Sequence, residues 1–332
     1  MISFVDVLIT VIFLLLLAAP GFIFAKAKML PNSASETLST IALYGCQPVL
    51  IIMSFQGCKF DSSIGLNMLL VAGIGLFVHL LMFAVVKFAF IKWKTDDKVK
   101  IVKYLSVFSN CGFMGLPFLQ SLFSDPQMQS EAVIYCAVII AVFQMLNWTF
   151  GVYIITGDKK EVSVKKILLN PVIISIVIGF LLFITLKKPF VELAAVDTLG
   201  YKILSKLTSS LNFISNMVTP LSMFVIGIRL ANIRLKQLFT SGWAYAATAM
   251  KLFVMPILTM FIVAYLPMAS TIKYTLFFLL SMPSATSGVM LAVKYNKDSD
   301  FASICVLLST VLCVLTIPPL YLFMNSVLCI PI

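Results

Sequence analysis

Ten stretches without Asp, Glu, Lys or Arg follow one another along the chain, and each is between 19 and 32 residues long. A hydrocarbon core of about 30 Å is crossed by about 20 apolar residues in a helix. The pattern therefore predicts an all-α integral membrane protein with ten transmembrane helices and short connections. The stretches are residues 7–25, 37–58, 62–86, 104–124, 132–157, 167–186, 207–228, 252–272, 274–293 and 301–332.

The composition supports the membrane interpretation and narrows the classes of function. Of 332 residues, 61% are hydrophobic and 11% are charged, against about 45–50% and about 25% in soluble domains. The seven cysteines form no CxxC pair and there is one histidine, so neither a disulfide framework nor a zinc site fits. No P-loop or nucleophile–base pair is present. We therefore expect no enzyme, no cofactor and no metal.

The basic residues predict an orientation. Seventeen of the 24 lysines and arginines lie in the odd-numbered connections and six in the even-numbered ones. The remaining one, Lys251, lies in the eighth stretch, which extends back toward Trp243. Because cytoplasmic loops are rich in Lys and Arg, we expect a multi-pass protein of the cell membrane with both termini outside. The net charge of +11 then suits anionic lipid of the inner leaflet rather than nucleic acid.

Prolines recur at similar offsets in the two halves of the chain. The pairs are 172 and 166 residues apart, and they are Pro48 with Pro220 and Pro117 with Pro283. Five spans in each half give the halves opposite orientations in the membrane. The spacing thus predicts two inverted five-helix repeats with broken helices, a hallmark of secondary transporters, over residues 1–166 and 167–332.

The fourth and ninth spans contain the strongest helix-breaking segments. Gly112–Pro117 lies about 12–20 Å into its span and Pro283–Gly288 about 14–21 Å, at 1.5 Å per residue. Both depths are near the middle of the bilayer, where freed backbone groups need partners from protein, water or ligand. The N-termini of the outgoing half-helices suit a carboxylate. We therefore expect a binding site where these two spans cross.

Polar residues inside the spans complete the candidate site. Lys251 is explained either by snorkelling or structural pairing, or by a cavity in which it attracts an anion. His79 is explained either by helix packing or by a role as proton carrier. The expected substrate-binding residues are Gln47, Asn110, Gly112, Gly115, Pro117, Asn216, Lys251, Pro283, Ser284, Thr286 and Ser287.

Several motifs resemble those of one transporter family. The segment Asn110-Cys-Gly-Phe-Met-Gly-Leu-Pro117, the segment Thr219-Pro220-Leu-Ser-Met-Phe-Val-Ile-Gly227 and the run from Met282 to Ala285 are similar to spans four, seven and nine of the auxin efflux carrier family. That family includes the plant PIN proteins and bacterial organic-acid permeases. The resemblance implies a fold like that of sodium–proton antiporters and bile-acid symporters. It also implies an elevator-type carrier with scaffold and transport parts, whose spans four and nine cross at unwound centres.

The function expected from these features is secondary transport of a small organic anion, auxin-like or malate-like, by alternating access. No Asp or Glu lies deep in any stretch, which argues against coupling through a buried carboxylate and favours a flux driven by the membrane potential. The alternatives are a sodium- or proton-coupled symporter and, less favoured, a channel or receptor. The expected partners are the anion and the bilayer, and a homodimer is compatible with the sequence.

Overall fold

The computed structural model describes residues 3–58, 61, 63–93, 96–162, 165, 168–196, 198–231 and 241–328. The two chain ends, Cys329 and five of the basic residues used above (Lys59, Lys94, Lys166, Arg234 and Lys236) lie outside these ranges. Within the described ranges the chain is helical, apart from connections and one isolated β-bridge. The expectation of an all-α membrane protein is therefore confirmed.

Eight helical runs are long and apolar enough to cross a membrane, counting the described residues. Each coincides with one of the ten apolar stretches, and the two stretches left over, 104–124 and 274–293, contain the broken helices. The runs are α1–α2 (Phe4–Leu17, Ala19–Lys26), α3–η1–α4 (Ala34–Thr40, Ile41–Cys46, Gln47–Gly57), α5 (Ser63–Ala89), α8–η4–α9 (Pro126–Leu146, Asn147–Gly151, Val152–Thr156), α11–η6 (Pro171–Leu186, Phe190–Leu193), α12–α13 (Leu199–Asn216, Val218–Ala231), α15–η7–α16 (Gly242–Ala249, Met250–Val254, Met255–Ala264) and α19 (Ser299–Leu328).

The fourth stretch consists of α6 (Asp97–Val107), a non-helical segment and the continuous pair η3 (Cys111–Gly115) and α7 (Leu116–Leu122). The ninth consists of α17 (Ser270–Ser281), a non-helical segment and α18 (Ser287–Lys294). None of these half-helices crosses a membrane alone. The broken character of both spans follows from the sequence, although the position of the first break does not, as described below.

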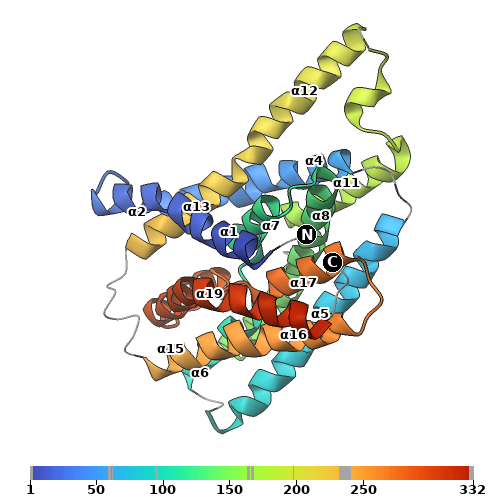
Figure 1. Cartoon of the computed structure of the whole chain (residues 1–332). Helices are drawn as coiled ribbons and strands as arrows, with labels where there is room; N and C mark the ends of the chain where they lie inside the picture. Colours follow the sequence, from blue (N-terminus) through green and yellow to red (C-terminus); the bar gives the residue numbers. More distant parts are fainter. Residues whose placement is uncertain are drawn as a thin grey trace.

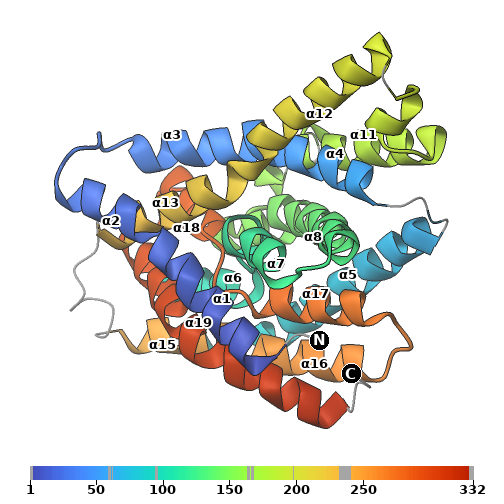
Figure 2. The same cartoon turned by 45° about the horizontal axis from the view of Figure 1, so that its top comes forward.

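The helices pack into two groups, visible in Figure 1 and Figure 2. The first group, here called the panel, contains α2–α4 and α11–α13; α13 packs on α2 and α3, while α11 and α12 pack on α4. Helix α1 lies between the groups and contacts α19 and α7 as well as α13. The second, here called the bundle, contains α5–α9 and α15–α19. Each group combines helices from residues 1–166 with helices from residues 167–332. The relation of the two halves as inverted repeats stays a prediction.

Two glycines hold α2 and α13 in backbone contact inside the panel. A Cβ on Gly21 would collide with the Phe224 carbonyl oxygen, and a Cβ on Gly227 would collide with the Ala18 carbonyl oxygen and lie 2.7 Å from the Phe22 nitrogen. The opposing atoms are backbone and cannot turn away. Small residues at helix crossings allow such close approach in membrane proteins. The two glycines therefore permit the tight packing of α2 against α13 that holds this part of the panel together.

Four π-helical turns, η1, η3, η4 and η7, interrupt the described helices. Three of them directly precede a helix with proline at its second position: Pro48, Pro117 and Pro256. Proline lacks an amide donor and clashes with the carbonyl four residues before it, and one widened turn relieves that conflict. These prolines therefore bend and widen their helices without breaking them.

Candidate functional site

The two broken spans meet through their main chains. The Asn110 amide donates a hydrogen bond of 2.8 Å to the Pro283 carbonyl oxygen, and the Ala285 amide donates one of 2.9 Å to the Phe108 carbonyl oxygen. The pair forms an antiparallel bridge centred on Ser109 and Ser284. Each break thus satisfies backbone groups of the other, which the membrane interior requires of any unwound segment.

The observed first break lies earlier than the sequence suggested. The non-helical residues are Phe108–Asn110, whereas the predicted segment Gly112–Pro117 lies in η3 and the first turn of α7. The π turn accommodates Pro117, and the pairing with Pro283 fixes where the helix opens. The second break includes Pro283, as predicted, and α18 begins at Ser287.

The Lys251 ammonium lies on the crossing but does not line the cavity described below. This side chain is fully buried, at 0% exposure, and it donates to the Ser109 hydroxyl, to the Val107 carbonyl oxygen at 3.4 Å and to the Leu280 carbonyl oxygen at 3.2 Å. Those carbonyls belong to the last turns of α6 and α17, where helix dipoles concentrate negative partial charge. The ammonium therefore neutralises both incoming half-helix ends at once.

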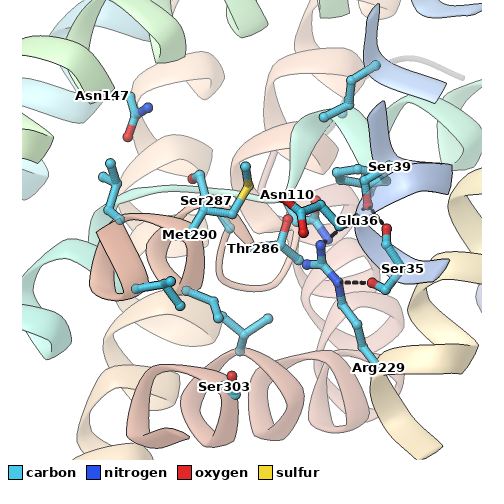
Figure 3. A pocket seen from close by; sticks show the side chains of 18 of the residues that line it. Ser35, Glu36, Ser39, Asn110, Asn147, Arg229, Thr286, Ser287, Met290 and Ser303 are labelled. Carbon is cyan, nitrogen blue, oxygen red and sulfur yellow. Dashed lines mark hydrogen bonds between the residues drawn. The ribbon is translucent and has the colours of Figure 1, made fainter. Parts of the chain in front are cut away.

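A cavity of about 1250 Å³ lies between the panel and the bundle. One wall is formed by α3, η1, the start of α4 and the end of α13; the other is formed by the first break, η3, α8, η4, α18 and α19. Figure 3 shows its polar side chains converging from both walls. The crossing therefore forms part of the wall of a space that a small organic molecule fits.

The cavity reaches one end of the molecule only. Its outer lining residues come from the odd-numbered connections and the helix ends beside them, and they include Asn32, Lys98, Ser241, Asp298 and Asp300. No lining residue comes from the described parts of the even-numbered connections. The open end is therefore the lysine-rich end.

Ion pairs join two connections at that open end. Asp97 accepts from Lys100 at 2.8 Å and from Lys297 at 3.0 Å, and Lys98 lies 3.9 Å from Asp298. The hydrogen bond from Lys100, followed in importance by the one from Lys297, holds the pKa of the Asp97 carboxyl below its ordinary value. The start of α6 is thus tied to the connection between α18 and α19.

A chain of polar side chains closes the bundle wall. The Tyr104 hydroxyl donates to the Asn147 side-chain oxygen at 2.5 Å and lies 2.7 Å from the Ser287 hydroxyl. Tyr104 is buried, and Asn147 and Ser287 line the cavity. This chain links α6, η4 and α18 and fixes the orientation of polar groups that a ligand would meet.

Arg229 lies on the opposite wall, near the end of α13. Its Nε donates to the Ser35 hydroxyl at 3.1 Å, its Nη2 donates to the Ser39 hydroxyl at 3.4 Å, and its guanidinium lies 5.8 Å from the centre of the Phe113 ring. Figure 3 shows the guanidinium directed across the cavity toward Asn110 and Thr286. The sequence pattern had assigned Arg229 to a connection, because the apolar stretch ends at residue 228.

The structure brings only some of the expected site residues to the cavity. Five of them line it: Gln47, Asn110, Gly112, Thr286 and Ser287. Five others do not: Gly115, Pro117, Pro283, Ser284 and Lys251. Ser284 is fully buried and its hydroxyl donates to the Leu105 carbonyl oxygen at 2.9 Å, so it joins the two spans. Gly115 serves close packing, since a Cβ there would lie 2.7 Å from the Leu279 side chain.

Asn216 and His79 also lie away from the cavity lining. Asn216 is exposed at the joint between α12 and α13, so it does not line the cavity together with Gln47. His79 is fully buried in α5, with Nδ1 2.6 Å from the Gly75 carbonyl oxygen of its own helix. Its Nε2 has no hydrogen-bond partner among the described residues.

Comparison with known proteins now identifies the chain's family. Residues 6–321 match the model of the family described as "Membrane transport protein", Mem_trans, which is the auxin efflux carrier family. The chain belongs to the auxin efflux carrier family. It is also 25% identical, over 311 residues, to the "Uncharacterized transporter MJ1031" of Methanocaldococcus jannaschii, covering 92% of this chain and 95% of that protein.

Family membership establishes a multi-pass membrane transport protein. It confirms the resemblance drawn from the motifs around Asn110 and Pro283. It is also consistent with the expectation that this transporter is not an enzyme. Neither the family description nor the name of this relative specifies a substrate.

Proposed function

We propose that this transporter is a secondary carrier that moves a small organic anion across the cell membrane by alternating access. The observation that carries the proposal is the crossing of the two broken spans at the wall of the 1250 Å³ cavity between panel and bundle. Broken helices at a cavity are the usual place for substrate in such carriers. A site between these two groups of helices suits motion of one group against the other.

The polarity of the site favours a negatively charged substrate. The helices that begin at Cys111 and Ser287 direct their amino ends toward the crossing, and these ends carry positive partial charge. The Asn110 side chain lines the cavity, is 4% exposed and makes no hydrogen bond with the described residues. The carboxylates that line the cavity, Glu36, Asp298 and Asp300, lie in or next to first helical turns toward its open end.

We propose a flux driven by the membrane potential rather than by sodium. Carriers of this kind coordinate sodium with carbonyl oxygens at unwound or terminal helix segments. Here the carbonyls of Val107 and Leu280 already accept from the Lys251 ammonium, which supplies the positive charge that a bound cation would bring. An anion that leaves a cell with a negative interior gains about 2.3 kcal/mol per charge and 100 mV.

The orientation is part of the proposal. The lysine-rich end at which the cavity opens is assigned to the cytoplasm, so the described conformation is inward-facing and both termini are extracytoplasmic. A cysteine introduced at Lys159 should react with an impermeant maleimide only after the membrane is opened. One introduced at Glu192, at the opposite end, should react in intact cells. The reverse pattern would contradict this orientation.

The test of function is flux in proteoliposomes with a panel of radiolabelled organic acids. Imposed potential, sodium and pH are varied separately. We expect saturable anion flux that follows the potential and is unchanged when sodium is replaced by choline. Asn110→Ala should slow it, while Asn212→Ala, an exposed amide on α12, should not. Flux that requires sodium would refute the assignment of coupling, and flux that never saturates would favour a channel.

A further inference from the structure

We infer that Arg229 is the anchor for a carboxylate group, and that the substrate is an organic monocarboxylate with an apolar body. This inference rests on the proposed function and adds the residue that binds the negatively charged group of the substrate. It begins from a guanidinium that lines the cavity and that no carboxylate approaches within 4.0 Å in the described part of the chain.

Arg229 uses fewer than half of its N–H groups in hydrogen bonds with the described residues. A guanidinium has five N–H groups in a fixed planar fork. Two of them bond to the neutral hydroxyls of Ser35 and Ser39, and the other three, including both on Nη1, bond to no described residue. The two serines and the Phe113 ring hold the plane in position but bring no negative charge. The fork matches the two oxygens of a carboxylate.

A half-buried cation with no counter-ion among the described residues needs a further explanation in this environment. Charged side chains within membrane spans are costly and typically mark substrate pathways. Glu36 lines the same cavity, but it is exposed and forms no ion pair with Arg229. A carboxylate ligand bound to the guanidinium would supply the missing negative charge. The hydrogen bonds to the two serines would hold the guanidinium in the orientation that binds this ligand.

Gln47 provides an independent sign of a ligand on the same wall. Ser35, Ser39, Leu43 and Gln47 recur every four residues along the α3–η1–α4 run, and all four line the cavity. Gln47 is 1% exposed, and its side-chain nitrogen has no hydrogen-bond partner among the described residues. A buried amide donor left without a partner is unfavourable, and a ligand oxygen in the cavity would satisfy it.

The remaining lining favours one carboxylate and an apolar body. The inner part is lined by the apolar side chains of Leu43, Phe113, Ile140 and Phe143. The other described cations of the lining already have partners: Lys98 lies 3.9 Å from Asp298, and Lys294 lies 5.3 Å from the Trp148 ring centre and 5.2 Å from that of Tyr295. A second carboxylate on the ligand would therefore find no comparable fork.

The experiment compares an acid with its neutral amide. Binding of 3-phenylpropionate, 3-phenylpropionamide and malate is measured on the full-length protein in nanodiscs by scintillation proximity, for wild type, Arg229→Gln and Arg229→Lys. We expect Arg229→Gln to weaken binding of 3-phenylpropionate roughly 10- to 100-fold, the scale of a lost charge-assisted contact. Arg229→Lys should lose less, because it keeps the charge without the fork. Binding of the amide should change little.

Two control variants carry matched charge changes. Lys202→Gln removes one positive charge on exposed α12 and should leave binding unchanged. Glu36→Gln removes a negative charge from the same cavity and should not weaken binding of the acid. If Arg229→Gln does not fold, the partial loss expected of Arg229→Lys still decides the question.

Three outcomes would overturn the inference. They are absence of binding of 3-phenylpropionate to wild type, equal losses for acid and amide in Arg229→Gln, and tighter binding of malate than of the monocarboxylate. Equal losses would make Arg229 a structural link between α13 and α3. Binding that depends on Arg229 without any flux in proteoliposomes would instead reject the carrier function and leave the anchor standing.

Discussion

Replacing Lys251 by methionine tests how the crossing of the broken spans is held together. Methionine keeps a long unbranched side chain in the packed space but removes the ammonium. The carbonyls of Val107 and Leu280 would then lose their lysine donor at the ends of α6 and α17. Ser109 would lose less, because its hydroxyl also bonds to the Leu280 carbonyl oxygen, at 3.3 Å.

The magnitude follows from the Val107 carbonyl, because the Leu280 carbonyl keeps the Ser109 hydroxyl as a donor. A buried acceptor left without a partner costs about 1–3 kcal/mol, reduced by the desolvation that the buried charge no longer suffers. At about 2 °C per kcal/mol for a chain of this size, the melting temperature should fall by roughly 2–6 °C. Melting is followed by fluorescence-detected size exclusion after heating in detergent.

The matched control is Lys273→Met, a lysine at the start of α17 that bonds to the Ala264 carbonyl oxygen at 3.4 Å. It is only partly buried, so its loss should lower the melting temperature far less. Lys251→Arg keeps the charge and should fall between wild type and Lys251→Met. A Lys251→Met protein that melts with the wild type would show that the half-helix ends need no cation, and would remove the argument against sodium coupling.

Two further predictions concern the panel and the open end of the cavity. Gly227→Ala forces a Cβ against the backbone of α2 and should destabilise the protein by about 1–3 kcal/mol, whereas Gly73→Ala, whose Cβ meets nothing within 4 Å, should be neutral or stabilising in a thermal melt. Equal effects would refute the close contact. Asp97→Asn should lower the melting temperature slightly, as exposed ion pairs contribute about 0–1 kcal/mol. Because the folded pKa of Asp97 lies below the ordinary 3.8, that difference should persist from pH 8 to pH 5 and shrink only below about pH 4; a difference that vanishes at pH 6 would contradict the assignment.

The helical spans were predictable because they depend on a local property, the length of an apolar stretch. Eight stretches coincide with single helical runs, and the prolines and glycines of the other two predicted broken helices. The first break was misplaced because Pro117 is absorbed by the π turn η3, while the opening at Phe108–Asn110 is fixed by bonds to Pro283 and Ala285. A partner about 170 residues away leaves no local signal.

The candidate site was less predictable for the same reason. Arg229 reaches Ser35 across 194 residues of sequence, and no local pattern in the sequence pointed to that contact. Asn216 is exposed and lies outside the cavity lining, which its position beside Pro220 in the sequence did not reveal, because that position does not show which way the helix faces. For Lys251 the sequence left surface, pairing and cavity roles open, and the contacts with Val107, Ser109 and Leu280 give the pairing.

The antiparallel bridge between Ser109 and Ser284 has a consequence for how substrate preference can change among transporters of this kind. Its two hydrogen bonds join main-chain atoms of Asn110, Pro283, Ala285 and Phe108, so the architecture of the crossing is largely independent of the side chains that face the cavity. We expect substrate preference, in contrast, to depend on those side chains. Exchanging lining residues should therefore retune selectivity while the scaffold persists, which makes this crossing a favourable starting point for engineered transporters with new cargoes.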